Sequence, residues 1–222
     1  MDPAARFAEV LNGSAADRHM DLLWALVTAT VDHSVEVGSM LLGLDRVAEL
    51  CPNSFDGIID TLFASGMFAG DSDDYHDPRN SLLHDVLARR VGMPITLSVV
   101  AMEVGKRLGV PIRGVGLPGH FVIRDKQSGT FADPFGRGLR YDEPGMVASW
   151  KQRVGGEATF RPRMFAPASA HEIMLRILNN LKQSLIGRDQ PVLLARLVPL
   201  RAAFAELASE REEHRQWMRH FN

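Results

Sequence analysis

Apolar residues recur at helical spacing through residues 1 to about 70. The run from Ser14 to Asp17 has the form of a capping box, and apolar positions then follow at intervals of three and four. Gly38 and Gly43 interrupt the apolar pattern. Ser54 is an N-cap residue type directly before another apolar face. This region is therefore predicted to be helical, with breaks at the glycines.

The pattern sharpens from Asn80 onward. Asn80, or the serine after it, can cap a helix that runs to about Arg90, and Gly92 stands where a left-handed stop is favoured. Pro94 suits the first position of a second helix, because a proline needs no N–H partner there. Apolar residues surround much of this second helix as far as Gly109, so it is predicted to be the central, buried one.

Short strand-like segments come next, with turn residues from Lys126 to Gly129 between the second and the third. They are predicted at 112–117, 120–124, 130–132 and 139–141. Residues 146 to 168 are weakly patterned, and no element is predicted there.

The C-terminal part returns to a helical pattern. Ser169 to Glu172 is a capping box that opens a helix with its stop at Gly187. A further helix is predicted to start near Pro191, to be interrupted at Pro199 and to resume to the charged, amphipathic end of the chain.

Composition narrows the class of protein. The 222 residues are 45% hydrophobic and 23% charged, which is ordinary for a globular chain long enough to bury a core. A net charge of −2, with scattered basic residues, disfavours nucleic-acid binding. The N-terminus lacks the basic and apolar regions of a secretory leader, and no apolar run approaches the roughly 20 residues that cross a bilayer. We therefore expect a soluble protein without a nucleic-acid or membrane partner.

A single cysteine, Cys51, excludes an internal disulfide or a cysteine-based metal cluster and is compatible with a reducing cytoplasm, where we expect the protein to reside. The acidic segment from Asp71 to Asp77 lacks the spacing of a calcium loop, so it is interpreted as a solvated linker rather than a metal site. The chain contains no phosphate-binding loop, dinucleotide fingerprint or zinc-protease motif, and neither cofactor nor metal is predicted.

Candidate chemistry gathers after the predicted central helix. His120 and Asp133 lie on successive strand segments, and a helix start followed by a His strand and an Asp strand is typical of a thiol-type catalytic site. Cys51 lies outside this stretch and is interpreted as a small buried residue. Structural alternatives remain, since His120 could bond to neighbouring backbone and Asp133 could serve the turn at Pro134.

The blocks GMPITLSVVAMEVGKRLGVPIRGVGLPGHFVIR and FADPF resemble the transglutaminase-like superfamily, and more narrowly its SirB-like bacterial branch. The resemblance covers Tyr75 to about Gly138, and LNNLK at Leu178 to Lys182 is similar to the same branch. It implies an α+β fold: a papain-like core, with a central helix on a small antiparallel sheet, between N- and C-terminal helices. The implied regions are a helical part at 1–70, the core at 71–145, and a linker with tetratricopeptide-like helices at 146–222.

The resemblance also implies roles for individual residues. His120 takes the position of the catalytic base and Asp133 that of the residue that orients it. The nucleophilic Cys position falls near Pro94 to Thr96, and none of these is Cys. Thr96 and Ser98 remain candidate hydroxyl nucleophiles, because the SirB-like branch commonly has Ser or Thr here.

Binding candidates for the same cleft are Asn80, Arg90 and Arg124. Three hypotheses stay open: a non-catalytic binding or regulatory module for a peptide or protein partner, a divergent hydrolase or acyl-transfer enzyme, and a structural scaffold with a vestigial cleft. A hydroxyl within about 3.5 Å of a His120 ring nitrogen would favour the enzyme. The oligomeric state does not follow from the sequence.

Overall fold

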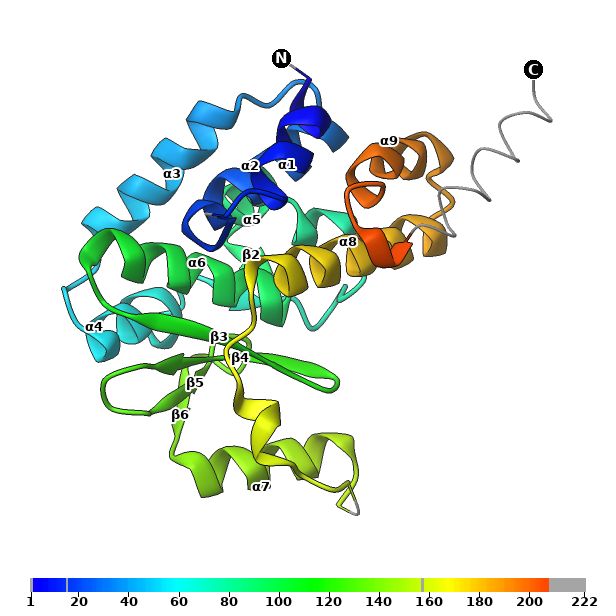
Figure 1. Cartoon of the computed structure of the whole chain (residues 1–222). Coiled ribbons are helices and arrows are strands. Elements are labelled where there is room, and N and C mark those ends of the chain that lie inside the picture. The colour runs from blue at the N-terminus through cyan, green and yellow to red at the C-terminus, as the bar shows by residue number, and fades with distance from the viewer. Residues whose placement is uncertain (1, 15, 157, 208–222) are drawn as a thin grey trace, which may run out of the picture.

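The computed structural model describes residues 2–14, 16–156 and 158–207 (Figure 1). Helices form one layer, a four-stranded sheet lies beneath them, and one further helix covers the far side of the sheet. The helices of the first layer are α1 (Pro3–Leu11), α2 (Met20–Val31), α3 (Val37–Glu49), α4 (Phe55–Ile59), α5 (Leu83–Arg89), α6 (Pro94–Leu108), α8 (Ala170–Gly187) and α9 (Pro191–Arg201). The helix on the far side is α7 (Glu143–Val154).

The main sheet is antiparallel throughout, in the order β3-β4-β5-β6. Its strands are β3 (Ile112–Leu117), β4 (His120–Asp125), β5 (Phe131–Asp133) and β6 (Leu139–Tyr141), and a separate parallel pair joins β1 (Ala69–Gly70) to β2 (Val91–Gly92). The predicted α+β class, with a central helix on a small antiparallel sheet, is confirmed.

The central helix is α6. Pro94 occupies its first turn, and Gly109 ends it at a φ of 73°, a left-handed conformation that glycine adopts without strain. Most of its residues are buried, because α2, α3 and α5 pack on one side and β3 and β4 on the other. The predicted position and burial of this helix are confirmed.

The register of the sheet brings His120 and Asp133 to one face. Leu117 pairs with His120 across a two-residue turn, in which Gly119 has a φ of 72°. Ile123 pairs with Ala132, so Asp133 follows opposite Val122, two residues from His120 along β4. Residues two apart on a strand point the same way, and diagonal neighbours of this kind are within side-chain reach.

Two cores lie on either side of the sheet. The larger one joins residues from the N-terminal helices, from α6 and from α8 and α9, so it includes side chains from all three regions predicted from the sequence. The division into those three regions stays a prediction. The smaller core lies beneath the sheet and consists of Val115, Leu117, Val122, Phe131, Met146, Trp150 and Phe165.

Several local predictions are wrong. Asn80 and Ser81 cap nothing: they end a 3₁₀ turn (Pro78–Ser81) that Asp77 caps, and α5 begins at Leu83 without a side-chain cap. The left-handed residue that ends α5 is Arg90, with a φ of 59°, rather than Gly92.

Three other elements also differ from the expectation. Gly38 and Gly43 lie inside α3 instead of breaking it, and α2 itself begins at Met20. The weakly patterned segment contains most of α7, a helix that buries only Met146 and Trp150 and so shows little periodicity. The predicted helical continuation at the C-terminal end lies outside the described residues beyond 207.

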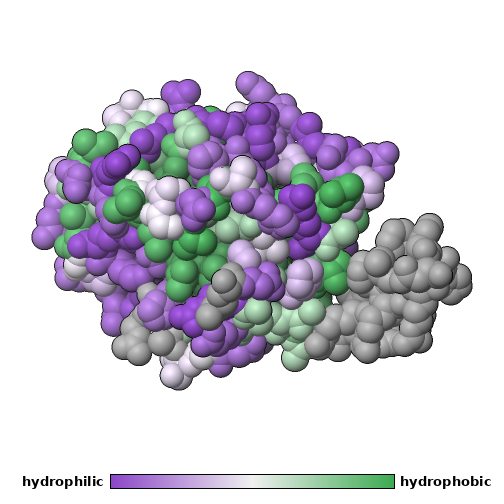
Figure 2. Space-filling model, turned by 90° about the horizontal axis from the view of Figure 1, so that it is seen from above, coloured by the Kyte–Doolittle hydropathy of each residue, from purple (hydrophilic) through white to green (hydrophobic). Residues whose placement is uncertain are grey.

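In the view of Figure 2, hydrophilic residues cover most of the surface and hydrophobic ones are interspersed among them. Among the described residues, no helix combines the length and the apolar character that a membrane-spanning segment requires.

Candidate functional site

His120 and Asp133 form a buried pair. His120 Nε2 lies 2.8 Å from Asp133 Oδ2, and the two residues are 4% and 2% exposed. The other carboxylate oxygen accepts backbone N–H groups from Phe135 and Gly136, each at 3.1 Å. Arg153 of α7 reaches Oδ2 at 3.4 Å. The carboxylate is thus held on both oxygens, and it fixes one ring nitrogen of His120.

Electrostatics keep this carboxylate ionised. Burial on its own raises the pKa of Asp133, but the hydrogen bond and charge of His120, the Gly136 N–H and the charge of Arg153 outweigh it. The net effect lowers the pKa below its usual value. The arrangement is chemically competent to orient a histidine as a base.

A pocket of about 170 Å³ opens beside His120. The start of α6 supplies Pro94 and Ile95, and the turn before β4 supplies Gly119. Tyr75, Phe121, and Arg176 and Asn180 of α8 complete the lining. The residues that face His120 from the helix start therefore carry neither a thiol nor a hydroxyl.

Several hydrogen-bonding groups that line this pocket have no partner among the described residues. Arg176 Nη2 donates to the carbonyl oxygens of Leu117 at 3.1 Å and His120 at 2.9 Å, which leaves its Nε and Nη1 unused among the described residues. Within the same described part of the chain, the Tyr75 hydroxyl and the Asn180 side-chain amide also form no hydrogen bond. These groups are available to a ligand.

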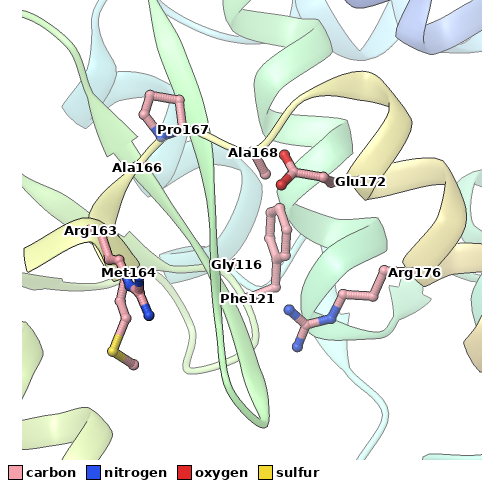
Figure 3. A pocket seen from close by; sticks show the side chains of 9 residues that line it. All are labelled: Gly116, Phe121, Arg163, Met164, Ala166, Pro167, Ala168, Glu172 and Arg176. Carbon is pink, nitrogen blue, oxygen red and sulfur yellow. The ribbon is translucent and has the colours of Figure 1, made fainter. Parts of the chain in front are cut away.

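A second pocket of about 290 Å³ adjoins the first and shares Phe121 and Arg176 with it. Figure 3 shows Arg176 extending from α8 toward the Phe121 ring, with Arg163 and Met164 on the opposite side. The two pockets give the site more length than the His120 pocket has alone.

Thr96 and Ser98, the candidate nucleophiles, are both fully buried and bonded to backbone. The Thr96 hydroxyl accepts from the Met93 N–H at 2.9 Å and lies 2.8 Å from the carbonyl oxygen of Asn80. The Ser98 hydroxyl donates to the carbonyl of Pro94 at 2.7 Å. Neither residue lines the His120 pocket, so this geometry argues against both as nucleophiles.

A Thr96→Val substitution is expected to lower the free energy of unfolding by about 2 kcal/mol, because it leaves a buried N–H and a buried carbonyl without their partner. Urea unfolding followed by circular dichroism measures the change. The matched control is Ser98→Ala, which removes a hydroxyl that bonds only within its own helix and is expected to change stability by less than about 1 kcal/mol. Equal effects of the two substitutions would contradict a structural role for Thr96.

The predicted binding residues do not line this pocket. The Asn80 side chain is buried and bonds to Asp71 at 2.9 Å and to Arg89 at 3.2 Å. Arg90 packs over the Phe68 ring at the end of α5. Arg124 bonds to the hairpin at the far end of β4 and to Glu143 of α7. Asn80, Arg90 and Arg124 thus have structural contacts, and we do not retain them as ligand-binding residues.

Cys51 lies at the end of α3 and takes no part in the pocket. It is buried, its Sγ lies 3.4 Å from the Val47 carbonyl oxygen, and burial raises the pKa of its thiol. The interpretation of Cys51 as a buried structural residue agrees with these contacts.

Sequence reasoning missed Tyr75, Arg153, Arg176 and Asn180. Two signals were present: Tyr75 begins the stretch that carries the resemblance, and Asn180 belongs to the LNNLK block. No sequence signal pointed to Arg153 or Arg176, because they reach the site from helices far along the chain.

The chain resembles several curated proteins over part of their length. A UPF0162 protein of Xylella fastidiosa is 38% identical over 134 residues, which are 58% of this chain and 48% of that protein. A UPF0162 protein of Pseudomonas aeruginosa is 34% identical over 56% of this chain and 46% of its own. The mouse F-box only protein 21 is 28% identical over 60% of this chain and 22% of its own. The chain thus spans about half the length of its bacterial relatives.

No solved structure matches this chain. The family model of the transglutaminase-like superfamily matches residues 25–179. That range includes α6 and the two strands that carry His120 and Asp133. Because the match covers well over half of the sequence, the chain belongs to the transglutaminase-like superfamily.

Proposed function

We propose that this protein is a non-catalytic binding or regulatory module that holds a segment of a peptide or protein partner in the groove beside His120. The observation that carries the proposal is the lining at the start of α6, where Pro94 and Ile95 occupy the place of a nucleophile. A His–Asp pair without an attacking group orients and binds, but it cannot form an acyl-enzyme intermediate.

The retained pair supports a second candidate. His120 bonded to a buried, ionised Asp133 at 2.8 Å is the arrangement of a general base, which could activate a water molecule for amide or thioester hydrolysis. We rank it second because the proposal of a binding module accounts for the unused donors of Tyr75, Arg176 and Asn180 as well.

The remaining parts of the proposal rest on resemblance and composition. We propose membership of the SirB-like branch, with α8 and α9 as the start of a tetratricopeptide-like region that adds interaction surface. A cytoplasmic location is proposed because the one cysteine is a free, buried thiol.

Turnover assays separate the two candidates. The full chain and its His120→Ala variant are incubated with a panel of peptide, amide and thioester substrates, and we expect no turnover above the uncatalysed rate from either protein. His33→Ala is the matched control, because His33 is an exposed histidine that does not line the pocket. Turnover that requires His120 but not His33 would overturn the proposal in favour of the hydrolase.

Binding is tested separately by selecting displayed random peptides on the immobilised full chain. We expect enriched peptides to bind the His33→Ala variant as well as the wild type and to lose about tenfold or more in affinity on His120→Ala, as expected for loss of a contact in the groove. Peptides that bind the His120→Ala variant equally well would show that the groove is not the binding site.

A further inference from the structure

The unused polar groups of the His120 pocket line the same space, and each of them can donate a hydrogen bond. Arg176 offers Nε and Nη1, Tyr75 a hydroxyl and Asn180 a side-chain amide, while no acidic side chain lines the pocket. The Asp133 carboxylate contacts His120, and its oxygens already accept from His120, Arg153 and two backbone N–H groups. A ligand in this pocket therefore meets donors and the charge of Arg176 without a carboxylate among the lining residues, and Glu172 lines only the adjoining pocket.

The positive charge around Tyr75 also favours an anionic ligand. Both Arg176 and Arg153 act on its hydroxyl to lower the pKa, although burial, the larger effect, raises it. The phenol thus stays protonated at neutral pH and lies in the field of two guanidinium groups. A protonated phenol donates a hydrogen bond to an anion.

Size limits what can enter. The pocket volume of about 170 Å³ is below the roughly 300–1,000 Å³ of a pocket for a drug-sized ligand, so it suits a small group at the end of a longer molecule. The planar fork of an arginine matches the two oxygens of a carboxylate, which also accept from neighbouring hydroxyl and amide donors.

We propose that the His120 pocket recognises a carboxylate of the bound peptide, held by Arg176 together with Tyr75 and Asn180. This inference rests on the proposed binding function and names the chemistry that the groove selects. The carboxylate belongs either to an acidic side chain or to the C-terminus of the peptide, since both present the same planar anion.

Small probes distinguish these sources on the full chain. Isothermal titration or NMR titration compares N-acetyl-glutamate amide, N-acetyl-glutamine amide, N-acetyl-glycine with a free carboxylate, and inorganic phosphate. We expect one or both carboxylates to bind with a Kd of about 1 mM and the neutral glutamine probe to bind at least tenfold more weakly. A glutamate preference assigns the site to an acidic side chain, and a preference for N-acetyl-glycine assigns it to a chain end.

Three variants test the assigned donors. Tyr75→Phe keeps the ring contacts and removes one hydroxyl, and we expect about tenfold weaker carboxylate binding, as for loss of a hydrogen bond to a charged group. Asn180→Ala is expected to weaken it by a similar factor, and Arg176→Gln by about thirtyfold or more. Because Arg176 also bonds to the turn before β4, the first two variants decide the matter if Arg176→Gln fails to fold.

The matched control is Arg113→Gln, which removes an exposed arginine of β3 that does not line the pocket. It is expected to change carboxylate binding by less than about twofold. Equal binding of the glutamate and glutamine probes, binding of phosphate alone, or unchanged binding in Tyr75→Phe and Asn180→Ala would overturn the inference. Enriched peptides that depend on His120 but lack any required carboxylate would overturn it while leaving the proposed binding function intact.

Discussion

Replacement of Asp133 by asparagine is expected to lower the free energy of unfolding by about 3 kcal/mol at pH 7. Asparagine keeps the shape of the side chain but removes the charge that faces His120 at 2.8 Å and Arg153 at 3.4 Å. Its amide oxygen can still accept from the backbone N–H groups, so the loss of stability reports the interactions of the carboxylate with His120 and Arg153. Urea unfolding of the full chain at pH 7 measures the change.

The effect has a defined dependence on pH. The folded-state pKa of Asp133 lies below its ordinary value of 3.8, so its contribution to stability is fully present above that value. The contribution is lost as pH falls from about 3.8 through the folded pKa, because protonation removes the charge that the native state stabilises. The difference in stability between wild type and Asp133→Asn should therefore shrink below pH 3.8.

Asp60→Asn provides the matched control, since Asp60 is 62% exposed and pairs with Arg140 at the surface. It is expected to change the free energy of unfolding by less than about 1 kcal/mol. If Asp133→Asn were as stable as the control at pH 7, or if its deficit persisted unchanged at low pH, the pair would not be the ionised contact described above.

Local signals predicted the parts of the fold that local physics determines. Pro94 and Gly109 mark α6 because one tolerates a helix start and the other a left-handed end. The capping box at Ser169 opens α8 as predicted, with Ser169 and Glu172 bonded to each other's backbone N–H. The strand pattern also predicted the sheet, because turn residues separate short apolar runs there.

The errors arise where tertiary contacts override local preference. Asn80 has the residue type of a helix cap, yet Asp71, the Asp74 carbonyl and Arg89 take up its side chain. The helix stop moves from Gly92 to Arg90 because residues 91 and 92 pair with β1 as a short parallel strand. Such pairings join distant segments and leave little trace in a local pattern.

The site likewise combines residues that the sequence predicted with residues that only tertiary packing brings in. The family resemblance predicted that His120 and Asp133 belong together, and their positions on successive strands agreed with it, because a hairpin determines their register. Tyr75, Arg153 and Arg176 come from segments that meet only in the folded chain. Their contribution therefore depends on how α7 and α8 pack, which periodicity alone does not encode.

An Ile95→Cys substitution is expected to create a thiol that iodoacetamide alkylates about 100-fold faster at pH 7 than native Cys51. Ile95 is the second residue of α6; its side chain is buried, but it lines the pocket that contains His120, and the shorter side chain of cysteine leaves room for a reagent on that side. A helix N-terminus carries a partial positive charge, which stabilises a thiolate and lowers the pKa of a thiol below about 8.5. Cys51 is expected to react slowly because it does not line this pocket and because burial raises the pKa of its thiol.

Mass spectrometry of the alkylated peptides measures both rates in one protein, and the pH dependence of alkylation gives the pKa of the new thiol. The matched control is Ser98→Cys, one turn further along α6, where a fully buried side chain is expected to react as slowly as Cys51. Adding His120→Gln to Ile95→Cys should raise the pKa of the thiol, since a histidine beside a thiol favours its thiolate. Slow alkylation of a folded Ile95→Cys variant would show that Ile95 does not face the open pocket. Fast, His120-dependent alkylation would instead show that the helix start and the His–Asp strands keep the geometry of a thiol site, and that the side chain at position 95 is what separates this protein from a catalyst.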